Sequence, residues 1–179
     1  MSTEILETPT LAGSEDRHLC FVLDGGQFAV QILQVREIIA MHPITPLPGL
    51  GAEVRGVINL RGKIIPVLDL RIMLGLHAKE QDRNTCIVVF DASFPDGGTA
   101  HIGCIVDSVR EVVLLPAEAI QAAPSPKVGG SAAFILGLAK PHPQEPPVSI
   151  LDIDYLVSDV LEQPDMAMFS MDEDSDDSE

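Results

Sequence analysis

Aromatic and basic residues are both scarce in this sequence. Only 4% of the 179 residues are aromatic, none of them Trp, and Tyr155 is the one Tyr. Proteins that bind single-stranded nucleic acid stack bases on exposed aromatic side chains beside basic grooves. Phosphate binding requires clustered basic side chains, but 11 Lys and Arg stand here against 27 Asp and Glu, a formal net charge of −16. The composition therefore excludes nucleic acid as a partner.

Long apolar runs and paired cysteines are missing as well. No uninterrupted apolar run approaches the ~20 residues of a membrane-spanning helix. Residues 1–15 hold three Glu and no Lys or Arg, unlike the positively charged start of a secretory signal. Cys20, Cys86 and Cys104 lie in separate apolar runs and form no Cys-X-X-Cys motif. This pattern predicts reduced core thiols in a cytoplasmic protein.

The common catalytic motifs are also lacking. The sequence contains no GxGxxG, Walker loop, GxSxG or HExxH, and its five His have no metal-ligand spacing. His101 and Cys104 are close in sequence, but residues three apart on a strand face opposite sides. Asp69, Asp107 and Asp152 each end an apolar run, where a cap or turn is the ordinary role. We therefore expect no enzyme activity, no metal and no cofactor.

The acidic residues are concentrated at the C-terminus. Residues 162–179 contain eight acidic residues and no basic one, which predicts a disordered acidic tail. Residues 1–17 are expected to form a disordered N-terminal segment, and residues 18–161 the folded domain. Met and Phe residues at 166–171 mix with the acidic ones, so the tail either docks on a partner or stays solvated; composition favours the solvated tail.

The domain begins with two hairpin patterns. Residues 18–32 predict a hairpin that turns at Gly25 and Gly26. Residues 54–69 predict a second hairpin, in which Gly62 is available for a positive φ.

Local signals connect and follow these hairpins. Residues 33–39 fit either a short helix or a strand. Pro66 places its strand on a sheet edge or at a bulge, where no N–H donor is required. Asp69 is placed to cap a short helix over residues 70–74, which Gly75 stops.

The second half of the domain repeats this style after a polar stretch, residues 77–84, which we interpret as the midpoint. Further strands are expected over residues 85–90, 101–106, 109–115, 133–138 and 148–153. Residues 154–162 predict a short helix with Tyr155, Leu156 and Val160 facing inward. At least eight short strands without a long helix predict an all-β barrel or sandwich architecture.

Polar residues inside apolar patterns are the candidate functional groups. Glu37 lies in an apolar run, and Asn59 and Arg61 lie at the turn of the second hairpin. There are two interpretations of Arg61. It is either a charged residue that keeps the hairpin turn exposed to solvent, or it forms a pair with Glu37 at the rim of an apolar groove. Such a pair would orient a partner more than it would stabilise the fold.

Four blocks of sequence carry a family resemblance. They are residues 21–39, residues 48–71 with the Asn59-Leu60-Arg61-Gly62 motif, residues 103–112 and residues 149–156. With these blocks the chain resembles the CheW family, the adaptor proteins of bacterial chemosensory arrays. The resemblance covers about residues 18–160 and implies an all-β fold of two SH3-like five-stranded β-barrel subdomains with a few short helices.

The resemblance also implies a function and a site. A CheW-like protein is a non-catalytic adaptor between the cytoplasmic tip of methyl-accepting chemoreceptors and the regulatory domain of a CheA-type histidine kinase. It would meet the membrane only indirectly, through receptors at its inner face. The receptor tip would enter an apolar groove between the barrels. The residues that match the receptor-facing site are Val35, Glu37, Gly56, Asn59, Leu60, Arg61 and Gly62. No residues are assigned to the kinase-facing surface.

Two features depart from the family pattern: the Pro-rich residues 141–147 and the acidic tail. They leave the pathway open, whether swimming, twitching motility or second-messenger control. A small-ligand-binding module that uses the same groove is a further alternative.

Overall fold

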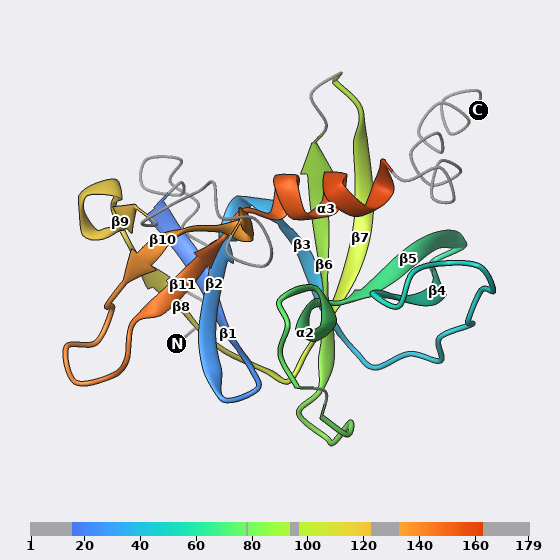
Figure 1. Ribbon diagram of the computed structural model, residues 1–179, viewed down its shortest axis with the longest axis horizontal. Coiled ribbons are helices and arrows are strands. Elements are labelled where there is room, and N and C mark those ends of the chain that lie inside the picture. Colours follow the sequence, from blue (N-terminus) through green and yellow to red (C-terminus); the bar gives the residue numbers. More distant parts are fainter. Residues whose placement is uncertain (1–15, 78, 94–96, 123–132, 163–179) are drawn as a thin grey trace.

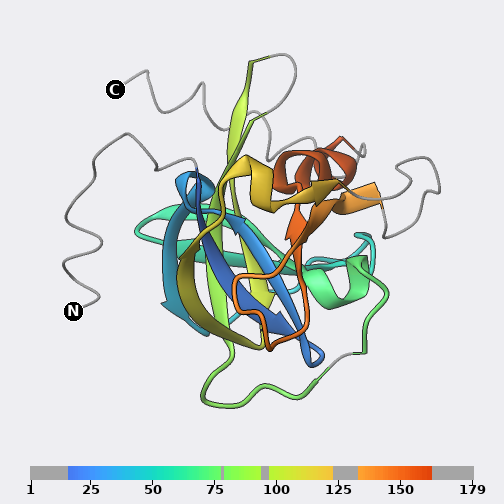
Figure 2. The same cartoon turned by 90° about the vertical axis from the view of Figure 1, so that its left-hand side faces the viewer.

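The structure is a computed structural model that describes residues 16–77, 79–93, 97–122 and 133–162 (Figure 1). Figure 2 shows the same fold turned by 90°. Two β-sheets make up most of it. The first has six strands in the order β8-β1-β2-β11-β10-β9, and the second has five in the order β3-β6-β7-β5-β4. The expected N-terminal segment, residues 1–17, and the expected tail, residues 162–179, lie outside the described residues except for Asp16, Arg17 and Glu162, and Arg17 already belongs to the first strand.

The strands and helices are short, as expected for an all-β fold of two subdomains. The strands of the first sheet are β1 (Arg17–Leu23), β2 (Gly26–Gln31), β8 (Ser108–Leu114), β9 (Gln121–Ala122), β10 (Ile135–Ala139) and β11 (Val148–Leu151). Those of the second are β3 (Val35–Ala40), β4 (Val54–Leu60), β5 (Lys63–Asp69), β6 (Cys86–Ser93) and β7 (Thr99–Val106). The helices are η2 (Ile32–Gln34), α2 (Leu70–Met73), η3 (Ala117–Ala119) and α3 (Ile153–Leu161). The prediction of five strands per subdomain holds, apart from the additional two-residue β9.

The two sheets do not divide the chain at its middle. The first sheet takes its strands from both ends of the domain, and β2 pairs with β11 in parallel. The second sheet is formed by the segment between them, from β3 to β7. Residues 77–84, interpreted above as the midpoint, connect α2 to β6 within the second sheet's segment, so that interpretation is wrong.

Both predicted hairpins form, but the first turns one residue earlier than expected. β1 and β2 are joined by Asp24 and Gly25, with φ of 50° and 80°. The β4–β5 turn places Arg61 and Gly62 at φ of 56° and 85°. Two consecutive positive φ angles are the requirement of the tight hairpin turn whose twist matches the strands. A non-glycine residue stands first in each turn, which the sequence signals did not anticipate.

The local signals after the first hairpin have mixed outcomes. Residues 33–39 contain both alternatives, since η2 leads directly into β3. Asp69 caps α2 by accepting a hydrogen bond from the Arg71 N–H, and Gly75 follows the helix at φ 73°. Pro66 is not on an edge strand, because β5 lies between β7 and β4. The pairing of β5 with β7 begins only at Val67, however, so Pro66 has β4 as its paired neighbour.

The hydrophobic core has three parts, since both faces of the central strands are buried. The largest cluster lies between the sheets and includes Phe21, Phe90 and the inner face of α3. Smaller clusters fill the opposite face of each sheet, around Cys20 and Ile150 in the first and around Ile65, Ile87 and Val89 in the second. Burial of successive residues on opposite faces explains why these strands read as continuous apolar runs.

Helix α3 closes the large cluster, but not with all the residues that were expected. Its N-cap is Asp152, whose carboxylate accepts from the Tyr155 N–H at 3.1 Å. Leu156 and Val160 are buried as predicted, whereas Tyr155 is 47% exposed. Its ring lies against Phe134 at a centroid distance of 5.6 Å, so it covers the edge of the core.

A buried charge network joins the two sheets. The Arg71 guanidinium donates to both carboxylate oxygens of Asp69 at 3.0 and 3.1 Å and to Asp107 at 3.2 Å. Asp107 also accepts from the Asp24 N–H at 2.7 Å, in the β1–β2 turn. All three side chains of the network are at most 4% exposed. Asp69 therefore has the cap role expected of it, whereas Asp107 binds Arg71 and the N–H of the distant β1–β2 turn.

Candidate functional site

The β4–β5 turn carries the candidate site. Arg61 donates two hydrogen bonds to the Glu37 carboxylate, from Nη1 to Oε2 at 2.5 Å and from Nη2 to Oε1 at 2.6 Å. The Arg61 side chain is 69% exposed and that of Glu37 21%. Paired bonds of this kind fix the plane of the guanidinium as well as its position.

The pair also has a place in the sheet. Glu37 lies on β3, one edge of the second sheet, and Arg61 projects from the turn that ends β4, the other edge. The ion pair therefore bridges the two edges of a strongly curved sheet. The rim-pair interpretation of Glu37 and Arg61 agrees with this geometry, in that the contact exists and is exposed.

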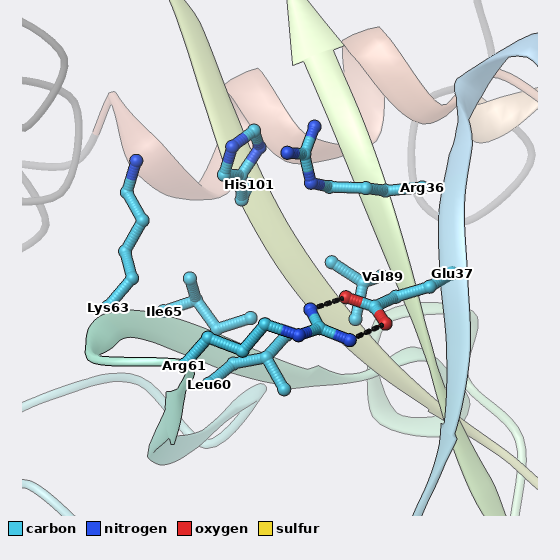
Figure 3. Close-up of a pocket in the computed structure, with 8 residues that line it drawn as sticks. All are labelled: Arg36, Glu37, Leu60, Arg61, Lys63, Ile65, Val89 and His101. Atoms are coloured by element: carbon cyan, nitrogen blue, oxygen red, sulfur yellow. Dashed lines mark hydrogen bonds and ion pairs between the residues drawn. The ribbon is translucent and has the colours of Figure 1, made fainter.

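A hollow of about 170 Å³ opens beside this pair (Figure 3). Its lining residues all belong to β3, β4, β5, β6, β7 or the β4–β5 turn: Arg36, Glu37, Leu60, Arg61, Lys63, Ile65, Val89 and His101. The apolar members form its floor, and the charged side chains surround it (Figure 3). The hollow is thus a feature of the second sheet. The expectation of an apolar groove between the barrels is wrong, because the large core cluster fills the space between the two sheets. Glu37 and Arg61 instead lie beside a hollow in the second sheet.

The seven residues matched to the receptor-facing site do not all meet at the hollow. Glu37, Leu60 and Arg61 line it. Asn59 and Gly62 shape the turn, since the Asn59 side-chain oxygen accepts from the Gly62 N–H at 2.9 Å.

Val35 and Gly56 lie apart from it. The register of β3 against β6 shifts between Val35 and Glu37, so Val35 packs against the large core cluster while Glu37 faces the hollow. Gly56 has φ 144°, and a Cβ there would lie 2.2 Å from the Thr45 carbonyl oxygen. Because Gly56 has no side chain, the backbone of Thr45 can approach it closely. Thr45 and Val57 exchange two backbone hydrogen bonds of 2.9 Å.

A second charged group at the hollow was not predicted from the sequence. Asp91 on β6 lies 3.4 Å from Arg36 and 2.8 Å from His101. Asp91 and His101 are direct cross-strand partners of β6 and β7. A polar residue between apolar neighbours on β7 is a signal that could have identified His101, which is half-buried, but identifying Asp91 as its partner requires the strand register.

The charges of the site affect Glu37. Its hydrogen bonds with Arg61 hold the pKa of this carboxyl below its usual range. Glu37 is therefore ionised throughout the neutral range, and the pair is an ion pair there. By contrast, burial raises the pKa of Cys104 far above its ordinary value, so this thiol is an unreactive core residue.

Within residues 16–162, wherever the structure describes them, no three His, Cys, Asp or Glu side chains are grouped to hold a metal ion. Among the described helices, none has the length and apolar character required to cross a membrane.

Comparison with known proteins gives the family. The fold and site define a two-sheet β protein with an exposed charged turn, and the CheW-like domain matches residues 17–161. The chain therefore belongs to the CheW-like family. It is 31% identical over 140 residues to "Chemotaxis protein CheW" of Klebsiella aerogenes, covering 78% of this chain and 80% of that one.

Other relatives agree. The crystal structure of scaffolding protein TtCheW from Thermoanaerobacter tengcongensis superposes with a TM-score of 0.68 at 28% identity, covering 79% of this chain and 92% of that chain. "Protein PilI" of Pseudomonas aeruginosa is 28% identical over 123 residues, 68% of this chain and 65% of that one. The family is one of scaffolding adaptors in chemotaxis, as the resemblance implied.

Proposed function

We propose that this protein is a non-catalytic adaptor that couples the cytoplasmic tips of chemoreceptors to the regulatory domain of a CheA-type histidine kinase. The observation that carries the proposal is the Glu37–Arg61 pair, in which Arg61 is exposed on the turn that matches the family's most specific motif. Exposed ion pairs contribute little to stability, about 0–1 kcal/mol, whereas charges at a rim give orientation and specificity to a complex.

In this mechanism the turn, the hollow and its rim meet the receptor tip, and another surface meets the kinase. The receptor-facing residues are those at the hollow, Glu37, Leu60 and Arg61, with Asn59 and Gly62 holding the turn. Gly56 and Val35 contribute indirectly: Gly56 allows the close approach of the Thr45 backbone, and Val35 packs against the large core cluster. The core shared by the sheets makes the domain one packed body, through which a shift at one surface reaches the other.

The test is binding of the full chain to a receptor-tip fragment and, separately, to a kinase regulatory domain. We expect Arg61→Glu to weaken receptor-fragment binding at least about tenfold, or about 1.4 kcal/mol, because it sets two carboxylates against each other at the rim. Binding to the kinase domain is expected to stay unchanged. Isothermal calorimetry on both partners measures this.

Two further variants separate the possible causes. Arg83→Glu makes the same charge change on an exposed residue of the α2–β6 connection, and it should leave both affinities unchanged. Exchanging the charges in Glu37→Arg/Arg61→Glu restores an ion pair in the opposite orientation. Continued loss of receptor binding in this double variant assigns the pair to recognition, whereas full recovery would assign it to closing the sheet. Wild-type binding by Arg61→Glu would contradict the proposal.

The pathway is the finer question. The relatives include chemotaxis proteins and Protein PilI, so an adaptor for a pathway other than swimming is the alternative. Receptor-tip fragments from each chemosensory system of the same cell, titrated in parallel, distinguish these by affinity.

A small-ligand module fits the hollow less well. Small-molecule sites typically enclose about 300–1,000 Å³ and are mostly apolar. The hollow is smaller than this, and five of its eight lining residues are charged or titratable. A purine nucleotide is therefore expected to give no shift in melting temperature.

A further inference from the structure

We propose that the loop between β10 and β11, residues 140–147, is a strap that holds the edge strand β8 to the first sheet, and that protonation of His142 tightens it. The loop leaves the sheet at the end of β10 and returns at the start of β11 (Figure 1). It contains the Pro-rich residues 141–147, which depart from the family pattern and have no part in the site described above. The strap is independent of the adaptor function.

Two ion pairs attach the strap to β8. The Nε2 atom of His142 lies 2.7 Å from the Glu111 carboxylate. The Glu145 carboxylate accepts a hydrogen bond from Arg110 at 3.3 Å and another, also 3.3 Å, from the side-chain amide of Gln27 on β2. Since β1 and β2 lie between β8 and β11 in the sheet, the strap reaches across two strands to make these contacts.

The two anchoring residues of β8 form a β-bulge. The register of β8 against β1 shifts between Leu19 and Phe21, so Arg110 and Glu111 both stand opposite Cys20. A bulge disrupts the ladder locally and redirects the side chains that it carries. In the sheet β8 is paired with β1 alone. The strap therefore attaches at the place where the edge strand is held least by its neighbour.

The strap also closes one end of the smaller core cluster of the first sheet. Ala139 and Val148, the residues on either side of the loop, belong to this buried cluster together with Cys20. Burial raises the pKa of the Cys20 thiol to about 11, and the charges of Glu111 and Glu145 add to this effect. The carboxylates at the two attachments thus lie near the buried thiol, and opening the strap would expose this end of the cluster.

The groups around His142 determine the sign of the pH dependence. The charged and titratable ones are Glu111 and Arg110 on β8, Glu145 and Lys140 on the loop itself, and Cys20 on β1. A neutral ring donates an ordinary hydrogen bond from Nε2 to Glu111, whereas a charged ring makes a charge-assisted one, about twice as strong. Histidine side chains ordinarily change charge between pH 5 and pH 8. A proton that strengthens the closed contact favours the closed strap, so closure increases as the pH falls.

The second attachment stays constant in this range. The hydrogen bond from Gln27 and the charge of Arg110 hold the pKa of Glu145 below its usual range, so Glu145 keeps its negative charge from pH 8 to pH 5.5. The pH dependence of the strap therefore comes from His142 alone.

This direction suits the overall charge of the chain. At pH 7 a net charge of −16 keeps copies of the chain apart, but this repulsion weakens towards the isoelectric point near 4.4. A loosely held edge strand offers unpaired backbone groups to another chain. A strap that tightens as the pH falls secures β8 under the conditions in which charge repulsion protects it least.

Amide hydrogen exchange of the full chain, followed by mass spectrometry, tests the strap. His142→Gln keeps a hydrogen-bond donor for Glu111 but cannot become charged. At pH 5.5 we expect the amides of β8 to exchange about two to five times faster in this variant than in wild type, the effect of losing one exposed ion pair. At pH 8 the two proteins should exchange at the same rate. Comparing them at one pH cancels the intrinsic pH dependence of exchange.

Three controls accompany the comparison. The other sheet's edge strand β3 should exchange equally in both proteins, and His42→Gln, a change just beyond β3, should leave β8 unaffected. In a Glu111→Gln background, His142→Gln should have no further effect on β8. Equal exchange of β8 in wild type and His142→Gln at pH 5.5 would overturn the proposal. So would a difference that persists at pH 8 or without Glu111, or one that appears equally in β3.

Discussion

Replacing Arg71 with Met is expected to lower the free energy of unfolding by about 3–5 kcal/mol at neutral pH. The guanidinium is buried and bonded to Asp69, Asp107 and the Lys79 carbonyl oxygen. Met has a similar length but no charge, so two buried carboxylates lose their partner, and removal of one partner from a buried network costs about this much. Urea unfolding followed by circular dichroism measures it.

The pH dependence of stability gives a second, independent test of the Arg71 network. Burial alone would raise the pKa of Asp69, but the hydrogen bonds and charge of Arg71 hold it below its ordinary value. In wild type, Asp69 therefore stabilises the fold above about pH 3.9, the unfolded value, and this stability is lost only as the pH falls through the lower folded pKa. Between pH 8 and pH 5 its contribution is constant.

Without Arg71 the sign reverses. Only the backbone N–H of residue 71 and the half-exposed Arg55 then remain to oppose burial. We therefore expect the pKa of Asp69 to rise above its unfolded value, so that the folded variant binds a proton more readily than the unfolded chain and its stability falls as the pH rises. The deficit relative to wild type should therefore shrink from pH 8 to pH 5, a window that stays above the isoelectric point near 4.4. Arg55→Met is the control, since Arg55 contacts Asp69 from a half-exposed position, and it should cost about 1 kcal/mol or less. An equal loss in both variants would show that the buried network is not the cause.

Gly56→Ala is expected to destabilise the protein by about 3 kcal/mol. The backbone at Gly56 has φ 144°, a region that costs a side-chain-bearing residue about 1–3 kcal/mol. The new Cβ would also lie 2.2 Å from the Thr45 carbonyl oxygen, a backbone atom that moves only if the 45–57 bridge opens. The measurement is again the free energy of unfolding, with hydrogen exchange at the Thr45 and Val57 amides to detect opening.

Gly62→Ala is the matched control for this substitution. Gly62 also has a positive φ, 85°, but a Cβ there has no atom within 4 Å among the described residues. Its expected cost is the conformational part alone, about 1–2 kcal/mol. If both variants lost the same stability, contact with Thr45 would be irrelevant. The comparison bears on function, because a defect in receptor binding at Gly56 would then be explained by the displaced segment rather than by a direct contact.

Much of this fold could be predicted from local patterns. The hairpins follow from apolar runs separated by Gly, and the cap of α2 follows from Asp69 and Gly75. What local patterns do not contain is the pairing of distant strands. Nothing in residues 26–31 indicates that β2 will lie beside β11, because a parallel pair is decided by packing across the whole domain. The apparent midpoint at residues 77–84 was an error of this kind.

The site could be predicted in part for a similar reason. Arg61 and Glu37 were identified as charged residues inside apolar patterns, and the contact between them is present. Asp91 and His101 were missed because their importance depends on cross-strand register. Tyr155 was placed inward by helical spacing, but in the first turn of α3 it lies at the boundary of the core.

The way in which the ends of the domain share one sheet affects the order in which the protein can fold as it is synthesised. The strands of the second sheet are complete once residue 106 has been made, and β8 follows at Ser108–Leu114. By contrast β2, among the first strands made, lacks its parallel partner β11 until residue 151. An isolated two-stranded hairpin is marginal in water. The earliest segment of the domain is therefore the last to be stabilised. A truncation before β11 would first destabilise β2, near the opposite end of the chain.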